Sequence, residues 1–455
     1  MLTSEIGPEA ATSRKALTVG LVAIMTLVAL EYMAVAIAMP IVGRELGGME
    51  LYSLAFSGAL AAGVVGTVVG GRWGDVRGPL GPLWSGLLTF AGGLLIAGFA
   101  PSMEVLIAGR LVQGFGGALT GIAIYVLVAR VYPEAQHPRM FSLFATAWVV
   151  PSMVGPAVVG AVAETIGWRW VFLAVPLLTI PAAVLLWRGL AGQPLTGGQA
   201  EPAPGFAVRV GWAALTAVGA AMVQYGSDGR LPLLVAGLAL LTVTLPRLLP
   251  RGTMRAARGL PTVVALRGLA AGAFLAGEVL VPLMLIGERD LSPILAGLAL
   301  TGGALSWSFG SWLQGRQVFA QQTNLGVGTA AITAGLLLMG SVAFEGVPVA
   351  IAYPAWVVGG FGIGLVYPTL SVLTLEISRP GEQGVNSSAL QLGEMVFTVV
   401  AIAVTGALFL AFGYATAFAA TVLIAVLGFS VAPRTATGKV AVLETVTPPE
   451  TRAAA

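Results

Sequence analysis

Residues 16–41 read ALTVGLVAIMTLVALEYMAVAIAMPI, an apolar run with a single charged side chain, Glu31. A helix needs roughly 20 mostly apolar residues to cross a bilayer, so this run is long enough. Because a helix rises about 1.5 Å per residue, Glu31 is expected near mid-depth. A charge at the bilayer centre costs roughly 2.5–3.5 kcal/mol even on lenient insertion scales, which marks Glu31 as a candidate functional residue.

Similar apolar runs recur along the whole chain. Of its 455 residues 57% are hydrophobic and 9% are charged, and the mean hydropathy is +0.91. Soluble domains carry about a quarter charged residues. The runs are separated by short polar breaks, so no soluble enzyme domain is expected. The sequence predicts an all-α integral membrane protein whose fourteen spans lie near 16–41, 51–71, 83–100, 103–129, 140–163, 170–187, 208–225, 231–246, 262–286, 292–313, 325–344, 347–375, 384–411 and 413–432.

The basic residues predict the orientation of these spans. An even number of spans places both termini on one side of the membrane. If that side is cytoplasmic, all but five of the 23 Lys and Arg residues fall in inner loops and tails. Arg267 is counted among these inner residues. An excess on the inner side is what the positive-inside rule requires, so a multi-pass protein of the cell inner membrane with cytoplasmic termini is expected. The exceptions are Arg44, Arg169, Arg230 and Arg289 on the outer side and Arg110 within a span.

Three pairs of motifs indicate two related halves. Glu31 and Glu278 each precede a proline in an apolar helix, residues 71–77 and 310–316 share G-x-W-x-[DQ]-x-R, and Gly-Phe-Gly occurs at 114–116 and 360–362. The members of these pairs are 247, 239 and 246 residues apart. The alternative is that glycine-rich apolar helices resemble one another by composition. Repeated halves around a midplane site are typical of transporters.

The repeat predicts four segments. Residues 1–189 form a six-helix bundle and residues 259–432 form a second one. Residues 190–258 supply a cytoplasmic linker and two additional transmembrane helices. Residues 433–455, rich in Thr, Pro and Ala, form a disordered cytoplasmic tail.

Several classes of function are disfavoured by composition. The chain has no cysteine and a single histidine, His137, which falls in a polar loop and is expected to be solvated. No metal site and no cofactor are therefore predicted, and a proton gradient is the expected driving force. The net charge is +3 and the basic residues are dispersed, which does not favour nucleic-acid binding.

Four ionisable residues lie deep in predicted spans and are candidates for proton coupling: Glu31, Arg110, Glu278 and Glu394. A Glu that faces both water and an Arg can gain and lose a proton near neutral pH, because burial and a nearby cation shift its proton affinity in opposite directions. Arg110 and Gln113 share one helix face with a strip of glycines. The alternatives are acids that stay protonated and hydrogen-bonded, and an Arg110 that snorkels toward the interface.

Further residues are candidates for binding the substrate and for changing conformation. Aromatic and amide side chains are expected to line a cavity, although single aromatic residues more often serve packing. The small-residue run with two prolines in span 140–163 is a candidate hinge. Three charges at the inner ends of spans are expected either to form a cluster that closes the cytoplasmic face or to be solvated. The cavity set is Tyr32, Gln113, Trp148, Trp307, Tyr367 and Gln391; the hinge set is Pro151, Gly155 and Pro156; the charged set is Asp75, Arg77 and Arg130.

Several motifs in these spans resemble those of one family over nearly the whole chain. Residues 30–40, LEYMAVAIAMP, are similar to an acid-led first-helix motif, and residues 106–116, LIAGRLVQGFG, match a fourth-helix motif. Residues 155–160, GPAVVG, resemble an antiporter motif, followed by WRWVF at 168–172 as its usual sequel. Residues 71–83 resemble the loop between the second and third helices. The chain thus resembles the major facilitator superfamily, specifically its fourteen-span drug/proton antiporters.

The resemblance implies a major facilitator fold, with two six-helix bundles and two additional central transmembrane helices. It also implies that Glu31 and Arg110 take part in proton coupling, that the Gly-Pro helix supports exchange, and that Asp75 latches the cytoplasmic side in the outward-facing state. The sequence departs from the family pattern in having Glu rather than Asp at 31, Met33 and Ala36 for a Thr and an Asn, and Pro79 and Leu80 for a basic pair.

The expected function is export of amphipathic or hydrophobic small molecules by proton antiport, that is, multidrug-type efflux by a monomer that works by alternating access. Export of an endogenous lipid or metabolite fits the apolar lining as well. A polytopic membrane enzyme would need a cluster of catalytic polar residues at one membrane face, and the sequence contains none. A sensor that has lost transport is disfavoured by the intact acid and fourth-helix motif.

Overall fold

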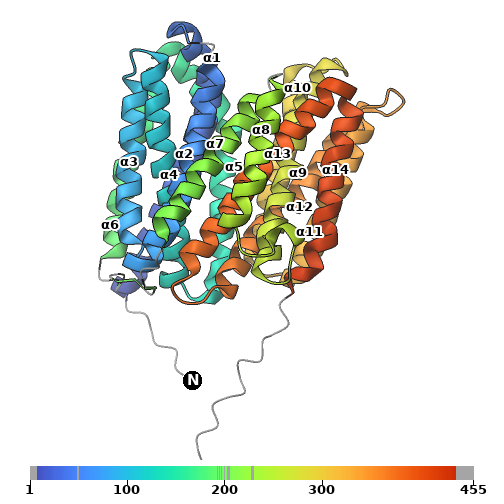
Figure 1. Ribbon diagram of the computed structural model, residues 1–455. Helices are drawn as coiled ribbons and strands as arrows, with labels where there is room; N and C mark the ends of the chain where they lie inside the picture. The colour runs from blue at the N-terminus through green and yellow to red at the C-terminus, as the bar shows by residue number, and fades with distance from the viewer. Residues whose placement is uncertain are drawn as a thin grey trace, which may run out of the picture.

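The structure is a computed structural model, which describes residues 8–48, 51–191, 205–226 and 230–436, together with 193, 195, 197, 198, 200 and 201. The described part is almost wholly helical (Figure 1). Backbone N–H and C=O groups in a bilayer must be satisfied within the protein, and helices formed from apolar runs achieve this. The helices are α1 (Pro8–Glu45), α2 (Tyr52–Arg77), α3 (Leu80–Gly98), α4 (Met103–Val131), α5 (His137–Thr165), α6 (Arg169–Leu190), α7 (Phe206–Gly226), α8 (Leu231–Leu248), α9 (Leu260–Gly287), α10 (Pro293–Gly315), α11 (Gln321–Ser341), α12 (Ala352–Ile377), α13 (Gln383–Phe412) and α14 (Tyr414–Val431).

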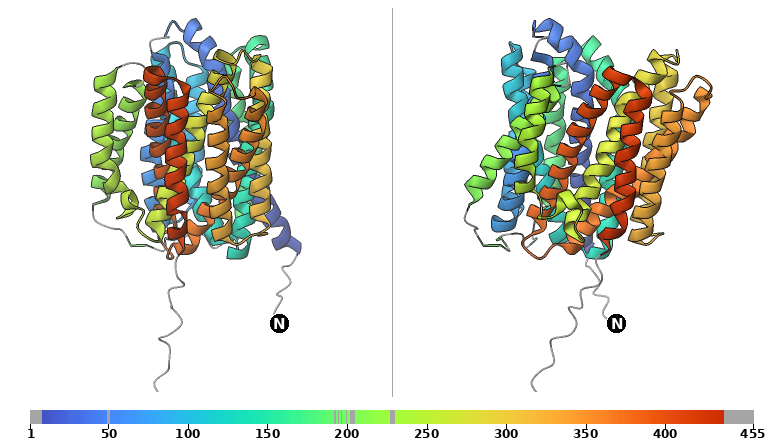
Figure 2. Two further views of the ribbon diagram at one scale, coloured as in Figure 1. Left: turned by 90° about the vertical axis from the view of Figure 1, so that its right-hand side faces the viewer. Right: turned by 45° about the vertical axis from the view of Figure 1, so that its right-hand side comes forward.

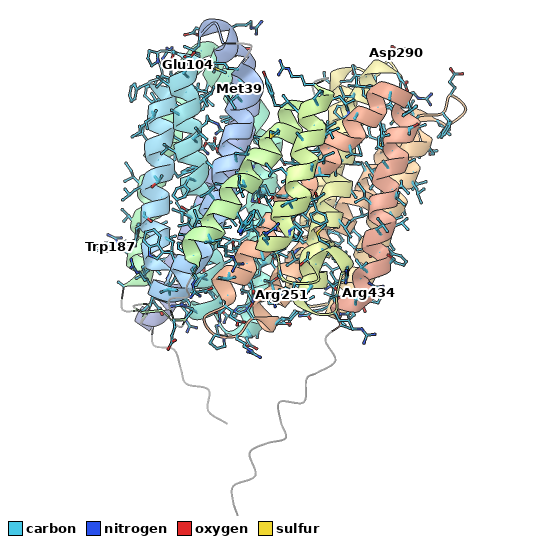
Figure 3. The ribbon with its side chains drawn as sticks, viewed as in Figure 1. Met39, Glu104, Trp187, Arg251, Asp290 and Arg434 are labelled. Atoms are coloured by element: carbon cyan, nitrogen blue, oxygen red, sulfur yellow. The ribbon has the colours of Figure 1, made fainter. Side chains whose placement is uncertain are left out.

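Each of the fourteen predicted ranges overlaps one of these helices, although 347–375 begins before α12 and 325–344 ends after α11. Within the described residues, twelve helices are long and apolar enough to cross a membrane, and the other two are α2 and α5. The protein is therefore a multi-pass membrane protein with about twelve candidate spans. The first turn of α1 and the last turn of α14 lie at the same end of the molecule, the lower end in Figure 1. Arg251 and Arg434 lie at this lower end, whereas Glu104 and Asp290 lie at the opposite one (Figure 3).

Helices α1–α6 pack on one another, as do helices α9–α14. The same close approach occurs in both groups. A side chain at Gly114 would collide with the backbone of Ala59, bringing α4 onto α2, and a side chain at Gly360 would collide with the backbone of Gly303, bringing α12 onto α10. Only glycine permits these approaches, so the two Gly-Phe-Gly motifs have the same structural role. The α7–α8 hairpin lies outside both groups and contacts α2 and α13 through α7 (Figure 2).

The two helix groups meet along α2–α13, α5–α10, α4–α13 and α5–α12. Several of these contacts lie toward the lower end. A side chain at Gly71 of α2 would meet Gly384 and Ser388 of α13, and one at Gly315 of α10 would meet Ser142 of α5. The hydroxyls of Tyr125 in α4 and Ser371 in α12 lie 3.4 Å apart across the same seam. The end of α2 therefore touches the start of α13.

His137 differs from its predicted environment. It begins α5 and is buried, and its Nε2 lies 2.9 Å from the carbonyl oxygen of Tyr132. The prediction of a solvated loop residue was wrong because the polar segment 133–137 folds back on the end of α4 and starts the next helix. His137 is thus a structural contact at the α4–α5 turn.

Candidate transport site

A buried network joins α1 to α4. Arg110 donates hydrogen bonds to carboxylate oxygen Oε1 of Glu31 and to the amide oxygen of Gln113, and Gln113 Nε2 donates to Glu31 Oε2 at 2.7 Å. Arg110 Nε also lies 3.4 Å from the carbonyl oxygen of Ala55 in α2. Glu31 is 3% exposed and Arg110 is 4% exposed. Arg110 does not snorkel toward the interface, because its guanidinium is held by Glu31 inside the protein.

The second acid–base pair joins α9 to α13 and was missed from the sequence. Arg267, assigned to an inner loop, lies inside α9 and is buried; its Nε donates to Glu394 Oε2 at 2.7 Å. Its Nη1 donates to the carbonyl oxygen of Tyr367 at 2.8 Å, and its guanidinium carbon lies 3.5 Å from the centre of the Tyr367 ring. A buried guanidinium or carboxylate is tolerated in apolar surroundings only when it is paired with an opposite charge. Glu394 is therefore neutralised by a residue that the prediction placed outside the membrane.

Replacing Arg267 by Met should lower stability, because Glu394 then loses its cation. Breaking a buried ion pair costs about 3–5 kcal/mol, whereas an apolar replacement of both partners is often close to neutral. We expect Arg267→Met to melt well below the unaltered protein in detergent, and Arg267→Met/Glu394→Leu to regain most of the loss. Tryptophan fluorescence during heating measures this, with the exposed Arg258→Met as control. A double variant less stable than either single one would contradict the pairing.

Glu278 is placed differently from the other two acids. It lies in the interior of α9 and is half-buried, and within the described residues it has no hydrogen-bond or ion-pair partner. It is close enough to Tyr32 of α1 and Tyr367 of α12 to interact with them electrostatically. Helix α12, which carries Tyr367, packs on α9.

The predicted cavity residues are distributed over both helix groups. Tyr32 exposes 52% of its surface although it lies in an apolar helix, and its ring lies 6.0 Å from that of Trp148 in α5. In the second group the rings of Trp307 and Tyr367 lie 5.3 Å apart. Gln391 of α13 extends toward α4, since a side chain at Gly121 would lie 3.8 Å from its amide oxygen. These rings supply apolar, polarisable surface in both helix groups.

Asp75 binds the start of α13. It is fully buried, and its carboxylate accepts hydrogen bonds from the backbone N–H groups of Gly384 and Val385, both at 2.8 Å. The charge lies at a helix N-terminus, where it is favourable. Within the described residues, Asp75 forms no ion pair with Arg77 or Arg130. Arg77 is exposed, whereas Arg130 is close enough to Asp75 to interact with it electrostatically and donates to the carbonyl oxygens of Gly74 and Gly197 at 3.1 and 3.0 Å.

The candidate hinge lies on α5 beside α1. Pro151 and Gly155 are buried, and a side chain at Gly155 would meet Leu30 and Met33 at 3.8 and 3.9 Å. The side chain of Pro156 lies outside the described residues. The close contact of α5 with α1 places this segment next to the Glu31 network.

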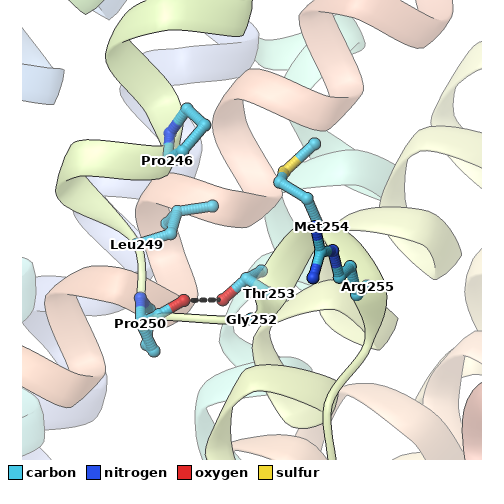
Figure 4. A pocket seen from close by; sticks show the side chains of 7 residues that line it. All are labelled: Pro246, Leu249, Pro250, Gly252, Thr253, Met254 and Arg255. Atoms are coloured by element: carbon cyan, nitrogen blue, oxygen red, sulfur yellow. Dashed lines mark hydrogen bonds between the residues drawn. The ribbon is translucent and has the colours of Figure 1, made fainter.

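A hollow of about 200 Å³ lies apart from these groups, at the turn after α8 (Figure 4). It is lined by Pro246, Leu249, Pro250, Gly252, Thr253, Met254 and Arg255. Thr253 donates a hydrogen bond to the carbonyl oxygen of Pro250 at 2.7 Å. No acid lines it, and we assign it no part in transport.

The family profile described as Major Facilitator Superfamily matches residues 21–401. The chain belongs to the major facilitator superfamily. The superfamily's members are transporters rather than enzymes, so the membrane-enzyme alternative loses its support. The human organic anion transporter MFSD10 superposes with a TM-score of 0.66 at 16% identity, covering 93% of this chain and 99% of that one. The proton:xylose symporter XylE superposes with a TM-score of 0.64 at 14% identity, covering 92% and 95%. At these identities the likeness concerns the fold alone.

Sequence relatives within the superfamily include proteins named as multidrug transporters. A probable multidrug-efflux transporter of Mycobacterium tuberculosis (strain H37Rv) is 25% identical over 80% of this chain and 81% of its own length. The multidrug transporter protein MdtP of Bacillus subtilis (strain 168) is 27% identical over 41% of this chain. That alignment spans only 34% of the Bacillus protein. The homology of this superfamily member to multidrug transporters is thus real but weak.

Proposed function

We propose that this protein exports amphipathic small molecules across the cell inner membrane by proton antiport. The observation that carries the proposal is the buried network of Glu31, Arg110 and Gln113. An ionised Glu31 holds the Arg110 guanidinium, and a proton on Glu31 removes that attraction. Proton binding can therefore change the packing of α1 on α4, which is the kind of two-state element that alternating access requires.

The proposal includes fourteen spans with both termini in the cytoplasm. Helices α2 and α5 contain 26 and 29 residues. At about 1.5 Å per residue they are about 39 and 43 Å long, more than the hydrocarbon core of about 30 Å. Both pack along helices that qualify as spans. The lower end, which holds Arg251 and Arg434, is the cytoplasmic one under the positive-inside rule (Figure 3).

In this orientation Asp75 closes the cytoplasmic face. Its bonds to Gly384 and Val385 hold the two helix groups together at that end, which is the arrangement of an outward-facing transporter. Opening the cytoplasmic face requires that these two bonds break. Asp75 is thus proposed as a latch, working at a distance from the proton site.

Transport by the purified protein tests this function. We expect proteoliposomes with an imposed pH gradient to move at least one member of a panel of amphipathic dyes, drugs and lipids uphill, and a protonophore to stop that flux. Movement restricted to lipids or metabolites would favour the alternative cargo. Fluxes equal to those of protein-free vesicles, with and without the gradient, would refute the proposal and favour a sensor.

A further inference from the structure

Arginines gather around the hollow at the turn after α8, and no acid accompanies them. Residues 205–226 and 230–277, which cover α7, α8, this turn and most of α9, contain seven arginines and no Asp or Glu. Only one of the seven, Arg267, forms an ion pair within the described residues. Helix α14 and the short turn after it, Ala432–Thr435, add one more arginine and again no acid. We call the arginines at this end of the molecule the basic cluster: Arg209, Arg247, Arg251, Arg255, Arg258 and Arg434.

Printed contacts place the cluster around the hollow. Arg209 Nη2 donates to the carbonyl oxygen of Leu248 at 3.1 Å, on the residue that adjoins the lining. Arg434 Nη1 lies 3.4 Å from the carbonyl oxygen of Arg255, which is itself a lining residue. Neutral carbonyls orient these cations without neutralising them. The side chains of Arg251 and Arg255 are exposed, and in the described part of the chain they have no hydrogen-bond or ion-pair partner.

The length of α8 sets the depth of the hollow in the membrane. Its 18 residues span about 27 Å, close to the hydrocarbon thickness of about 30 Å. Helix α8 packs mainly on α7, and the apolar side chains of Leu231, Val235 and Val243 are 64%, 57% and 48% exposed. Apolar side chains on the outside of a membrane protein contact lipid tails. A turn that directly follows such a helix therefore lies at the level of the lipid headgroups.

The lining of the hollow combines apolar side chains with a cation. Pro246 and Leu249 come from the end of α8, whereas Met254 and Arg255 come from the turn (Figure 4). The volume of about 200 Å³ is below the roughly 300–1,000 Å³ of pockets that enclose a drug-sized molecule. The hollow can thus hold a small headgroup while the rest of the ligand stays outside. Arginine suits phosphate, because its planar guanidinium presents several N–H donors at once.

We propose that the hollow and the basic cluster bind the headgroup of an anionic phospholipid from the cytoplasmic leaflet. The phosphate contacts Arg251 and Arg255, and the acyl chains lie along the exposed face of α8. Basic pockets at this depth are suited to anionic headgroups. The choice of leaflet follows the orientation proposed above. Residues 437–455 are a less suitable occupant, because they contain two acids and two basic residues, whose charges cancel.

Binding of the lipid should stabilise the fold, because a phosphate relieves the repulsion between neighbouring arginines. The test uses the purified full-length protein in an uncharged detergent. The probes are dioctanoyl phosphatidylglycerol, zwitterionic dioctanoyl phosphatidylcholine, and glycerophosphoglycerol, which is the first lipid's headgroup without acyl chains. A ligand that binds the folded state raises the melting temperature, which tryptophan fluorescence follows. We expect phosphatidylglycerol to raise it by several degrees and the other two probes to leave it unchanged.

Two pairs of substitutions locate the site. Arg251→Gln/Arg255→Gln should weaken the affinity for phosphatidylglycerol by about thirtyfold, the loss expected when two cations near an anionic lipid are removed. Arg188→Gln/Arg379→Gln is the matched control, since it removes two exposed arginines from other turns of the proposed cytoplasmic end. The control should keep the affinity of the unaltered protein. Without lipid both double variants should melt close to the unaltered protein, because all four side chains are exposed.

Several results would overturn the inference. Absence of a shift with phosphatidylglycerol, or an equal shift with phosphatidylcholine, would show that the site does not recognise an anionic lipid. An equal shift with glycerophosphoglycerol would indicate a site for free phosphate esters. Equal weakening by the control pair would reduce the effect to general attraction by the surface. Tighter lipid binding by Glu444→Gln/Glu450→Gln would identify residues 437–455 as the occupant. None of these measurements depends on transport, so the site and the proposed function can fail separately.

Discussion

Glu31→Gln is expected to abolish uphill export while leaving the protein folded and inserted. Glutamine keeps the size and the hydrogen-bonding oxygen of the acid, so Arg110 retains acceptors in Gln113 and in residue 31. It cannot take up or release a proton. Flux driven by a pH gradient in proteoliposomes should fall to the level of protein-free vesicles, whereas exchange of substrate down its own gradient should persist, because that exchange needs no coupling.

Two controls separate coupling from damage to the fold. Glu45→Gln removes an exposed acid at the end of the same helix, whose carboxylate lies 3.0 Å from Arg169, and should leave uphill flux unchanged. Glu31→Asp keeps the proton site with a shorter reach and should retain part of the uphill flux. Undiminished uphill export by Glu31→Gln, with the controls behaving as expected, would remove Glu31 from the mechanism.

The helices were predictable because their signal is local. An apolar run of about 20 residues has few alternatives to a spanning helix, and polar breaks mark its ends. The pairing of Glu31 with Arg110 was also within reach, since both residues sit in recognisable motifs. Both features could be predicted because the identity of the side chains themselves indicates them: apolar side chains indicate a span, and an acid and an Arg indicate a pair.

Arg267 was missed although the signal for it was present. It lies within the predicted span 262–286, between apolar neighbours, but was assigned to the inner loops together with Arg255 and Arg258. A cation inside a span requires a buried acid, and Glu278 and Glu394 were the two deep acids without a partner. Asking which cation each acid needs would have reduced the choice for Arg267 to these two acids, and the structure pairs it with Glu394.

The partner of Asp75 could not have been found in this way. It is the backbone of α13, some 309 residues away along the chain, and N–H groups at a helix start leave no mark on side-chain patterns. The sequence suggested basic side chains because Arg77 and Arg130 lie nearby. Such contacts between distant backbone and side chain become visible only when the two halves are placed side by side.

Asp75→Asn is expected to shift the protein away from the state in which the cytoplasmic face is closed. The amide accepts hydrogen bonds through only one atom, turns N–H donors toward those of Gly384 or Val385, and carries no charge for the α13 N-terminus. A charge at a helix start is worth about 0.3–2 kcal/mol, and one or two kcal/mol changes a population ratio by a factor of about 5–30. Transport rates should change more than substrate affinity.

The absence of cysteine makes this shift directly measurable. Ser388 lies in the seam beside Gly71, and Ser388→Cys would be the single labelling site of the chain. In inside-out vesicles a membrane-impermeant maleimide should label Ser388→Cys slowly in the otherwise unaltered protein and several times faster with Asp75→Asn. Glu382→Gln, an exposed acid at the same helix start, is the matched control. Equal labelling rates in all three backgrounds would mean that the bonds from Asp75 do not hold the cytoplasmic face closed, and the latch would have to be sought in the α5–α10 contact instead.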